Sequence, residues 1–189
     1  MNEYVKIFNG YRHAYGIADW TNATVDPESG KKKPDYRWTY EEFTDQIYQD
    51  HLTGEKSVGA QPTNENGDAK FGVIDIDPKA YEGFNKQFYL EAIKQYDLPL
   101  IPIESKSGGL HLYLFMAEFV PSTLVVSFLS NLLPLFNLKP DCEIFPKQTQ
   151  LTKDPETGIL KPGQFINLPY FESTKRRALN IDGTFFTLD

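Results

Sequence analysis

The chain has 189 residues, of which 24% are charged and 40% hydrophobic. This near-average composition excludes fibrous, coiled-coil and wholly disordered proteins, and the length suits one domain or two small lobes that share a cleft. The net charge of -7 argues against a protein that binds DNA through its whole surface, so any such contact has to be local.

The cellular setting follows from what the sequence lacks. The first four residues, Met-Asn-Glu-Tyr, do not form the basic and then apolar run of a secretory signal. No stretch reaches the roughly 18 apolar residues that a membrane helix needs. The single cysteine, Cys142, allows neither an internal disulfide nor a zinc site built from several cysteines. We therefore expect a soluble, cytoplasmic, monomeric protein with no membrane contact and no zinc.

The first part of the chain carries short local signals. Alternation predicts a strand over 4–9, and turn-forming residues predict an exposed loop over 22–37. Thr39 and Glu42 have the spacing of a helix N-cap and its capping-box partner. We expect a helix from Thr39 to about residue 52, ending near Gly54.

The rest of the chain mixes strands with helices. The strands expected at 100–104 and 110–116 are joined by five residues with two glycines, which is typical of a hairpin. Hairpins beside crossover helices favour an α+β fold over a doubly wound sheet. The other expected elements are strands at 71–76, 141–145 and 184–188, helices at 85–96 and 122–136, a loop at 151–163 and an extended run at 164–171.

Two aspartates are the first candidates for chemistry. Asp75 and Asp77 lie two apart on the strand expected before Pro78, so they should project from one face. Two neighbouring carboxylates repel each other, and a divalent cation such as Mg²⁺ or Mn²⁺ removes the repulsion. The competing interpretation is a strand end that turns into solvent, with Asp77 making a turn contact.

The hairpin loop is the second candidate. Ser105, Lys106 and Ser107 precede two glycines, and backbone amides, two hydroxyls and an ammonium group can bind a triphosphate. The loop is not a Walker A motif, because a strand follows it instead of a helix. His111 lies early on that strand. A plain turn and a buried core histidine are the competing interpretations.

A third pair of acids follows later in the chain. Asp141 and Glu143 share one face of a short expected strand, and either can supply a third carboxylate. An exposed edge strand that carries charge against aggregation is the competing interpretation.

The order of these three segments resembles the archaeo-eukaryotic primase superfamily, the catalytic domain of primase-polymerases. That family has an Asp-x-Asp strand, then a Ser-x-His-type strand after a small-residue loop, then a third strand with an acid. This chain has Val-Ile-Asp-Ile-Asp-Pro at 73–78, the loop and His111 at 105–111, and Asp-Cys-Glu-Ile-Phe-Pro-Lys-Gln at 141–148. One departure is Gly109, which stands where the family has the serine, so that Ser107 lies four residues before His111.

The resemblance is closest to the phage, plasmid and conflict-system branch, and it extends from about residue 8 to the C-terminus. Members of that branch have segments similar to His-Leu-Thr-Gly at 51–54, to residues 104–112, to Phe-Pro-Lys-Gln at 145–148 and to Asn-Leu-Pro at 167–169. The resemblance implies a fragment of a longer protein from a bacterial, archaeal or phage-infected cell, with a helicase module as a candidate neighbour.

The resemblance also implies a fold of two lobes. An N-terminal α/β lobe packs against an antiparallel lobe similar to an RNA-recognition-motif sheet, and the active site lies between them. We place the lobes at about 1–70 and 71–189, and the two can interleave.

The activity that the resemblance implies is templated nucleotidyl transfer from an NTP or dNTP to a 3′-hydroxyl on DNA. Asp75, Asp77 and Glu143 would hold two Mg²⁺ or Mn²⁺ ions, with Asp141 as the alternative third acid. Glu143 is favoured because the family segment is an acid followed by a hydrophobic residue, Phe and Pro. The residues expected to bind the nucleotide are Ser105, Lys106, Ser107, His111, Lys147 and Asn167, and those expected to contact the DNA template and primer are Arg12, Tyr15, Lys175, Arg176 and Arg177.

Three other functions remain open from the sequence. A metal-dependent nuclease uses similar carboxylates, although it has little need of the Ser-Lys-Ser-Gly-Gly loop. A nucleotide- or DNA-binding module of a replication initiator would bind without turnover. An α+β domain with acids scattered on its surface is the simplest alternative.

Overall fold

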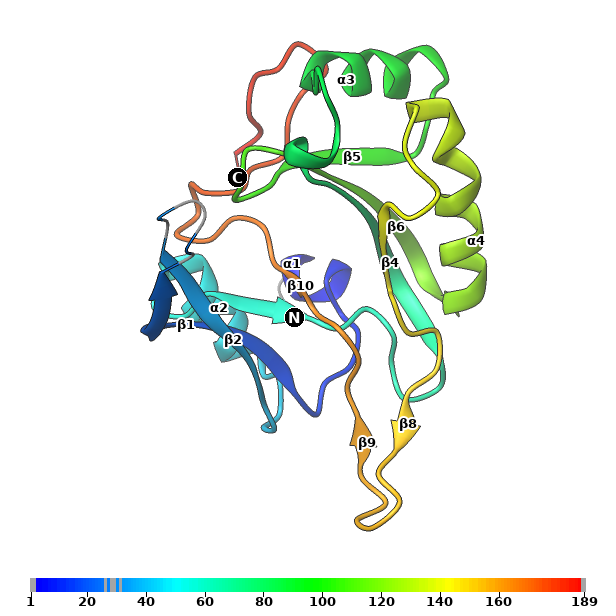
Figure 1. Cartoon of the computed structure of the whole chain (residues 1–189). Coiled ribbons are helices and arrows are strands. Elements are labelled where there is room, and N and C mark those ends of the chain that lie inside the picture. Colours follow the sequence, from blue (N-terminus) through cyan, green and yellow to red (C-terminus); the bar gives the residue numbers. More distant parts are fainter. Residues whose placement is uncertain (1–2, 26, 28–29, 31, 188–189) are drawn as a thin grey trace.

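The computed structural model describes residues 3–25, 27, 30 and 32–187, and within them the fold is α+β (Figure 1). The helices are α1 (Glu3–Ile7), α2 (Asp45–Thr53), α3 (Lys86–Gln95) and α4 (Ser122–Leu132), with single 3-10 turns η1 (Pro78–Ala80) and η2 (Pro134–Phe136). The strands are β1 (Tyr15–Val25), β2 (Lys32–Thr39), β3 (Val58–Ala60), β4 (Asp68–Ile76), β5 (Leu100–Glu104), β6 (Leu110–Pro121), β7 (Glu143–Phe145), β8 (Thr152–Lys153), β9 (Leu160–Lys161) and β10 (Ile166–Asn167).

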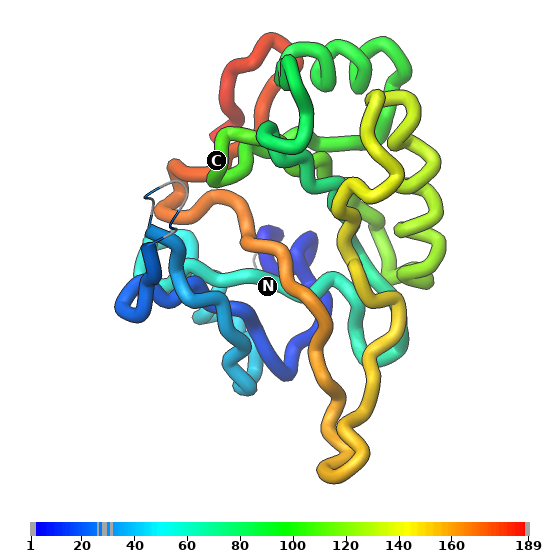
Figure 2. Tube along the Cα trace, in the orientation of Figure 1, coloured from blue at the N-terminus to red at the C-terminus, as the bar shows by residue number. Residues whose placement is uncertain are grey.

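Two antiparallel sheets form the framework. The first has the strand order β10-β3-β1-β2, so the C-terminal part of the chain returns to complete a sheet that the N-terminal part begins. The second has the order β5-β6-β4-β7, with β4 paired on both sides. The short ribbon of β8 and β9 extends away from both sheets, and the chain from 161 to 175 then crosses back to the first sheet (Figure 2).

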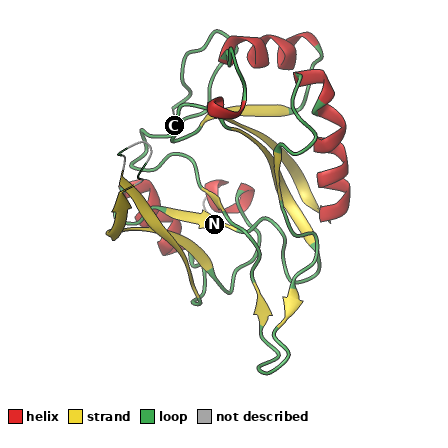
Figure 3. Ribbon diagram, in the orientation of Figure 1, coloured by secondary structure: helices red, strands yellow, loops and turns green. Residues whose placement is uncertain are grey.

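The second sheet is covered differently on its two faces. Helices α3 and α4 pack on the outer face, while the inner face is turned toward the first sheet (Figure 3). Alternation along β4 explains this arrangement, because Ile74 and Ile76 join the outer core while Phe71 and Val73 join the core between the sheets. Each fully buried side chain of this size stabilises the fold by about 1.5–3 kcal/mol.

The start of α3 and the end of α2 show ordinary capping chemistry. The Asn85 side chain accepts a hydrogen bond from the backbone amide of Gln87 and starts α3. Gly54 ends α2 in the left-handed conformation, with φ of 88°, which a residue without a Cβ adopts most easily. The predicted end of this helix is thereby confirmed.

Four expectations about local structure are wrong. The predicted strand at 4–9 is largely the helix α1, because Tyr4, Val5 and Phe8 are buried together on one helical face. The predicted loop at 22–37 is mostly the pairing of β1 with β2; residues 26, 28, 29 and 31 of it lie outside the described part.

The other two errors concern the ends of elements. Thr39 does not cap a helix, because it is the last residue of β2 and pairs with Tyr15, and α2 instead follows Thr44. In the described residues, the strand predicted at 184–188 is reduced to one bridge between Leu179 and Phe185; Leu188 lies outside them. Across the same described residues, the helices are too short or too polar to cross a membrane.

Candidate active site

The site is organised by the central strand of the second sheet. Asp75 on β4 lies directly opposite His111 on β6 and directly opposite Glu143 on β7. Side chains of directly opposed residues share a face, with Cβ atoms about 4.5–5.5 Å apart. The fold therefore brings together three polar residues that are separated by more than 30 positions in the sequence.

Opposed carboxylates destabilise a sheet unless a positive group compensates them. The two acids here have separate partners. The Nε2 atom of His111 lies 3.3 Å from Oδ1 of Asp75, and Nζ of Lys147 lies 2.6 Å from Oε1 of Glu143. His111 is buried, whereas the Glu143 side chain is exposed, so a ligand can replace Lys147 on Glu143 without opening the core.

Asp77 does not continue the strand. β4 ends at Ile76, and Asp77 caps the 3-10 turn η1, where its carboxylate accepts a hydrogen bond of 3.0 Å from the backbone amide of Lys79. Asp141 lies before β7 in a turn closed by the amide of Cys142 and the carbonyl of Lys139. Of the two candidate third acids, Glu143 is the one in register with Asp75.

The donor chemistry of the acids fits a hard divalent cation, because carboxylate oxygens are the ligands that Mg²⁺ and Mn²⁺ prefer. In the described part of the chain, no three acidic, histidine or cysteine side chains are gathered closely enough to form a metal site as they stand. A cation bound by Asp75, Asp77 and Glu143 together would compete with the contact of Glu143 with Lys147 and with that of Asp77 with the turn amide.

The predicted hairpin is confirmed, and its loop is tightly closed. The amide of Ser105 donates to the carbonyl of Gly109, and the hydroxyls of Ser105 and Ser107 lie 3.0 Å apart. Gly108 has a φ of +84°, which favours glycine. Gly109 runs against the carbonyl of Ile76, so a Cβ there would collide with the backbone at the end of β4. This close approach fixes the position of the loop relative to β4, the strand that carries Asp75.

A pocket of about 460 Å³ lies beside this loop, between the two sheets. Four cations and one acid line it, although the protein as a whole has a net charge of -7. The acid, Glu104, is already paired with Lys86 at 2.5 Å, which leaves the positive charges dominant. The charged and polar lining residues are Ser57, Glu104, Ser105, Lys106, Asn167, Thr174, Lys175, Arg176 and Arg177.

Two polar groups of the pocket wall are incompletely satisfied. The Oδ1 atom of Asn167 and the Nε atom of Arg176 are buried without a hydrogen-bond partner. Leaving such a group unpaired costs about 1–3 kcal/mol, and a bound ligand with polar atoms would recover part of that cost. Burial also lowers the pKa of the Arg176 guanidinium.

Lys106 is held at the mouth of the pocket by an aromatic ring. Its Nζ atom lies 3.9 Å from the centroid of the Trp20 ring, a cation–π contact between the loop and β1. Burial, and then the positive charge of Arg176, lower the pKa of Lys106 below its ordinary value. An anion in the pocket would stabilise both cations.

Not all predicted binding residues meet here. The pocket lining includes Ser105, Lys106, Asn167 and the basic cluster at 175–177. Arg12 instead pairs with Asp45 at 3.5 Å, and Tyr15 is buried with its hydroxyl 3.4 Å from Glu41. Neither of these two residues lines the pocket.

Sequence reasoning missed the aromatic part of the wall, which consists of Trp20, Tyr36, Phe171 and Phe185. Trp20 and Tyr36 belong to β1 and β2, and the loop predicted at 22–37 covered the end of the first strand and most of the second. The signal that could have predicted β1 is the spacing of Gly16, Ala18 and Trp20, which lie two residues apart as residues on one face of a strand do.

Comparison with known proteins and families identifies the family of the chain. No match to the chain was found among curated protein sequences. The family model described as the archaeo-eukaryotic primase domain of the TOTE conflict system matches residues 6–185, which includes both sheets, the three acids and the basic pocket. The match covers nearly the whole chain, and the protein therefore belongs to the archaeo-eukaryotic primase superfamily.

Proposed function

We propose that this domain is a template-dependent primase-polymerase that transfers a nucleotidyl group from an NTP or dNTP to a 3′-hydroxyl. The observation that carries the proposal is the placement of Asp75 in register with His111 and Glu143, on a sheet whose hairpin loop opens into a basic pocket. Acids for metal binding and cations for phosphate binding are the two parts that phosphoryl transfer needs.

The acids form the reaction centre in this proposal. Asp75, Asp77 and Glu143 would hold two Mg²⁺ or Mn²⁺ ions, which when bound make the 3′-hydroxyl more acidic and neutralise charge on the triphosphate. In the reaction, the 3′-hydroxyl gives up its proton to solvent, its oxygen forms a bond to the α-phosphorus, the bond from that phosphorus to the bridging oxygen breaks, and pyrophosphate leaves. His111 keeps Asp75 oriented through their 3.3 Å contact.

The basic pocket receives the triphosphate. Lys106, with Ser105 and Ser107 beside it, supplies an ammonium group and hydroxyl donors from the loop. Arg176 adds a buried guanidinium whose Nε has no partner, and the Asn167 side chain is available to a sugar or base. Lys147 contributes a further cation once it is released from Glu143.

The two sheets correspond in this proposal to the two lobes of the primase fold. The sheet β5-β6-β4-β7, covered by α3 and α4 on one face, would be the lobe similar to an RNA-recognition motif. The sheet β10-β3-β1-β2 would be the N-terminal lobe, to which residues 166–167 also contribute. The division at about residue 70 lies near the start of β4.

Primer extension tests the proposal. A labelled DNA primer on a longer template is incubated with dNTPs and Mg²⁺ or Mn²⁺, with Asp75→Ala/Asp77→Ala as the inactive control. We expect templated growth that disappears in the double variant and in EDTA. A shortened primer would contradict the proposal and indicate a nuclease. Binding of dNTP in calorimetry without any primer growth would also contradict it and indicate a nucleotide-binding module.

A further inference from the structure

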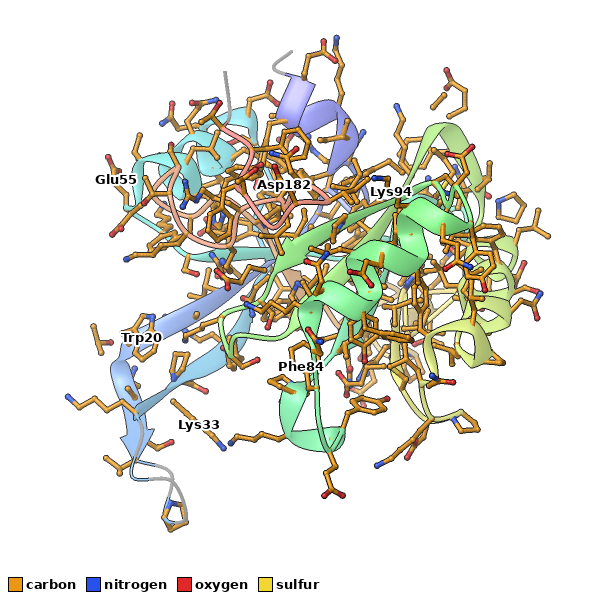
Figure 4. The ribbon with its side chains drawn as sticks, turned by 90° about the horizontal axis from the view of Figure 1, so that it is seen from above. Trp20, Lys33, Glu55, Phe84, Lys94 and Asp182 are labelled. Atoms are coloured by element: carbon orange, nitrogen blue, oxygen red, sulfur yellow. The ribbon has the colours of Figure 1, made fainter. Side chains whose placement is uncertain are left out.

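Two large aromatic side chains are left half-exposed beside the pocket. Trp20 on β1 and Tyr36 on β2 are each 47% exposed, and both line the pocket wall. The ribbon of β1 and β2 projects from the body of the protein, and Trp20 lies on it where the ribbon passes the second sheet (Figure 4). Each ring packs on one neighbour, Trp20 on Lys106 and Tyr36 on Phe165, and still leaves about half of its surface exposed beside a charged pocket, where a ligand can reach it.

Both rings line the same pocket from the β1–β2 ribbon. Ala18 is directly opposite Tyr36, so these two residues share one face of the ribbon. Trp20 follows where the register shifts between Asp19 and Thr24, and it lines the pocket together with Tyr36. Gly16 and Trp38 are the next opposed pair on that face, and the Phe165 ring packs against both of them. Phe165 thus fills the inner end of the face and also contacts Tyr36, with the two ring centroids 6.2 Å apart, while Trp20 and Tyr36 remain half-exposed.

Cations alternate with rings around the same wall. Lys106 lies over Trp20 at 3.9 Å, and Arg177 lies over Phe185 at 4.1 Å. Lys175 and Arg176 lie 5.4 and 5.5 Å from the centroid of Phe171. Rings that stack on bases, interleaved with cations that follow a phosphate backbone, are the common features of sites for single-stranded nucleic acid.

We propose that Trp20 and Tyr36 form a stacking platform for unpaired bases of a single DNA or RNA strand, which enters the active site along the β1–β2 ribbon. The proposal rests on the function proposed above and names these two rings as its contacts to the template. The cations of Lys175 and Arg177 would follow the phosphates of the same strand.

The geometry favours an unpaired strand over the other candidate nucleic-acid ligands. Bases in a duplex are stacked on one another and cannot reach two rings on a protein face, whereas an unpaired base can. A free nucleotide would use the pocket but would not need a row of rings along the ribbon.

The test is binding of a fluorescein-labelled twelve-residue thymidine oligonucleotide in EDTA, measured by anisotropy over a series of salt concentrations. Trp20→Ala and Tyr36→Ala should each weaken binding about 5- to 150-fold, the range found for loss of one stacked base. Neither change should alter the slope of log K against log salt, because no phosphate contact is lost. Lys175→Ala/Arg177→Ala should instead reduce the slope by about 1.4.

Matched controls separate this proposal from the function on which it rests. Tyr96→Ala removes a ring that is 52% exposed at the end of α3, and it should leave binding unchanged. Asp75→Ala/Asp77→Ala should bind the oligonucleotide like the wild type even though it extends no primer. Trp20→Phe should retain most of the affinity, which excludes misfolding as the cause of the loss in Trp20→Ala.

Two results would overturn the platform. One is unchanged oligonucleotide affinity in Trp20→Ala and Tyr36→Ala while wild-type primer extension is intact. The other is a loss of dNTP affinity in calorimetry with no loss for the oligonucleotide, which would assign the rings to the incoming nucleotide. If extension fails but oligonucleotide binding depends on both rings, the platform stands and only the catalytic proposal fails.

Discussion

The buried histidine of α2 offers a quantitative prediction about stability and pH. His51 is fully buried; its Nε2 lies 2.8 Å from the carbonyl of Pro169, and its Nδ1 accepts a hydrogen bond of 3.2 Å from the amide of Val58. One ring nitrogen donates and the other accepts, so the pair of contacts requires the neutral ring. Burial, and then the charge of Arg176, lower the pKa of His51 from 6.5 to about 4.

The lowered pKa makes the stability of the fold depend on pH. Below pH 6.5 the unfolded chain binds a proton at this histidine that the folded protein does not, so unfolding becomes easier as pH falls toward 4. The difference between the two pKa values corresponds to about 3 kcal/mol in total. Roughly 2 kcal/mol of this is lost by pH 5.

Urea unfolding at several pH values between 7.5 and 5 measures the effect. His51→Gln should be less stable than the wild type at pH 7.5, because Val58 loses its acceptor, but its free energy of unfolding should fall about 2 kcal/mol less on going to pH 5. Equal pH dependence in wild type and His51→Gln would refute the reasoning.

Three further predictions concern packing and the site. Gly72→Ala should destabilise the protein by about 1–3 kcal/mol in thermal unfolding, because the added Cβ would press on Val125 and lie 2.9 Å from a methyl of Leu129; an unchanged Tm would contradict the packing of α4 on β4. Glu143→Gln should abolish primer extension while Asp141→Asn retains it, and the reverse result would make Asp141 the third acid. Lys106→Ala should raise the Kd for dNTP in calorimetry about tenfold or more, and no change would reduce the loop to a plain turn.

Elements with strong local signals were predictable from the sequence. The strand at 71–76, the hairpin at 100–116 and the helices at 85–96 and 122–136 appear within a few residues of their predicted positions, apart from the longer β6. Pro78 has no amide hydrogen to continue the strand, and Gly108 adopts the positive φ that the turn of the hairpin loop requires, so both signals act locally. The α+β class followed from these elements.

The first sheet was not predictable in the same way. Its strands pair over long distances, and β10 at 166–167 joins a sheet begun at Tyr15. Thr39 has the chemistry of an N-cap, but pairing with Tyr15 keeps it in β2. Tertiary pairing overrides local propensity in both cases.

The sequence could propose which residues form the candidate site, but it could not predict how they are arranged in space. Asp75, His111 and Glu143 could be named from their segments, whereas their direct opposition depends on the register of three strands. Asp77 was expected beside Asp75 on a strand, but Pro78 starts a turn that Asp77 caps. The role of the Trp20 and Tyr36 rings was not predictable, because it depends on the pairing of β1 with β2 that places both at the pocket.

The most direct test of the central claim is addition of a single nucleotide opposite a defined template base. Four primer–template duplexes that differ only in that base are each incubated with one dNTP at a time and Mg²⁺ or Mn²⁺, using the wild type and Asp75→Asn. We predict that the wild type adds only the complementary nucleotide and that Asp75→Asn, which keeps the shape of the side chain but removes its charge, adds none. Addition that ignores the template base, or equal addition by both proteins, would contradict the assignment of this sheet as the catalytic centre of a templated polymerase.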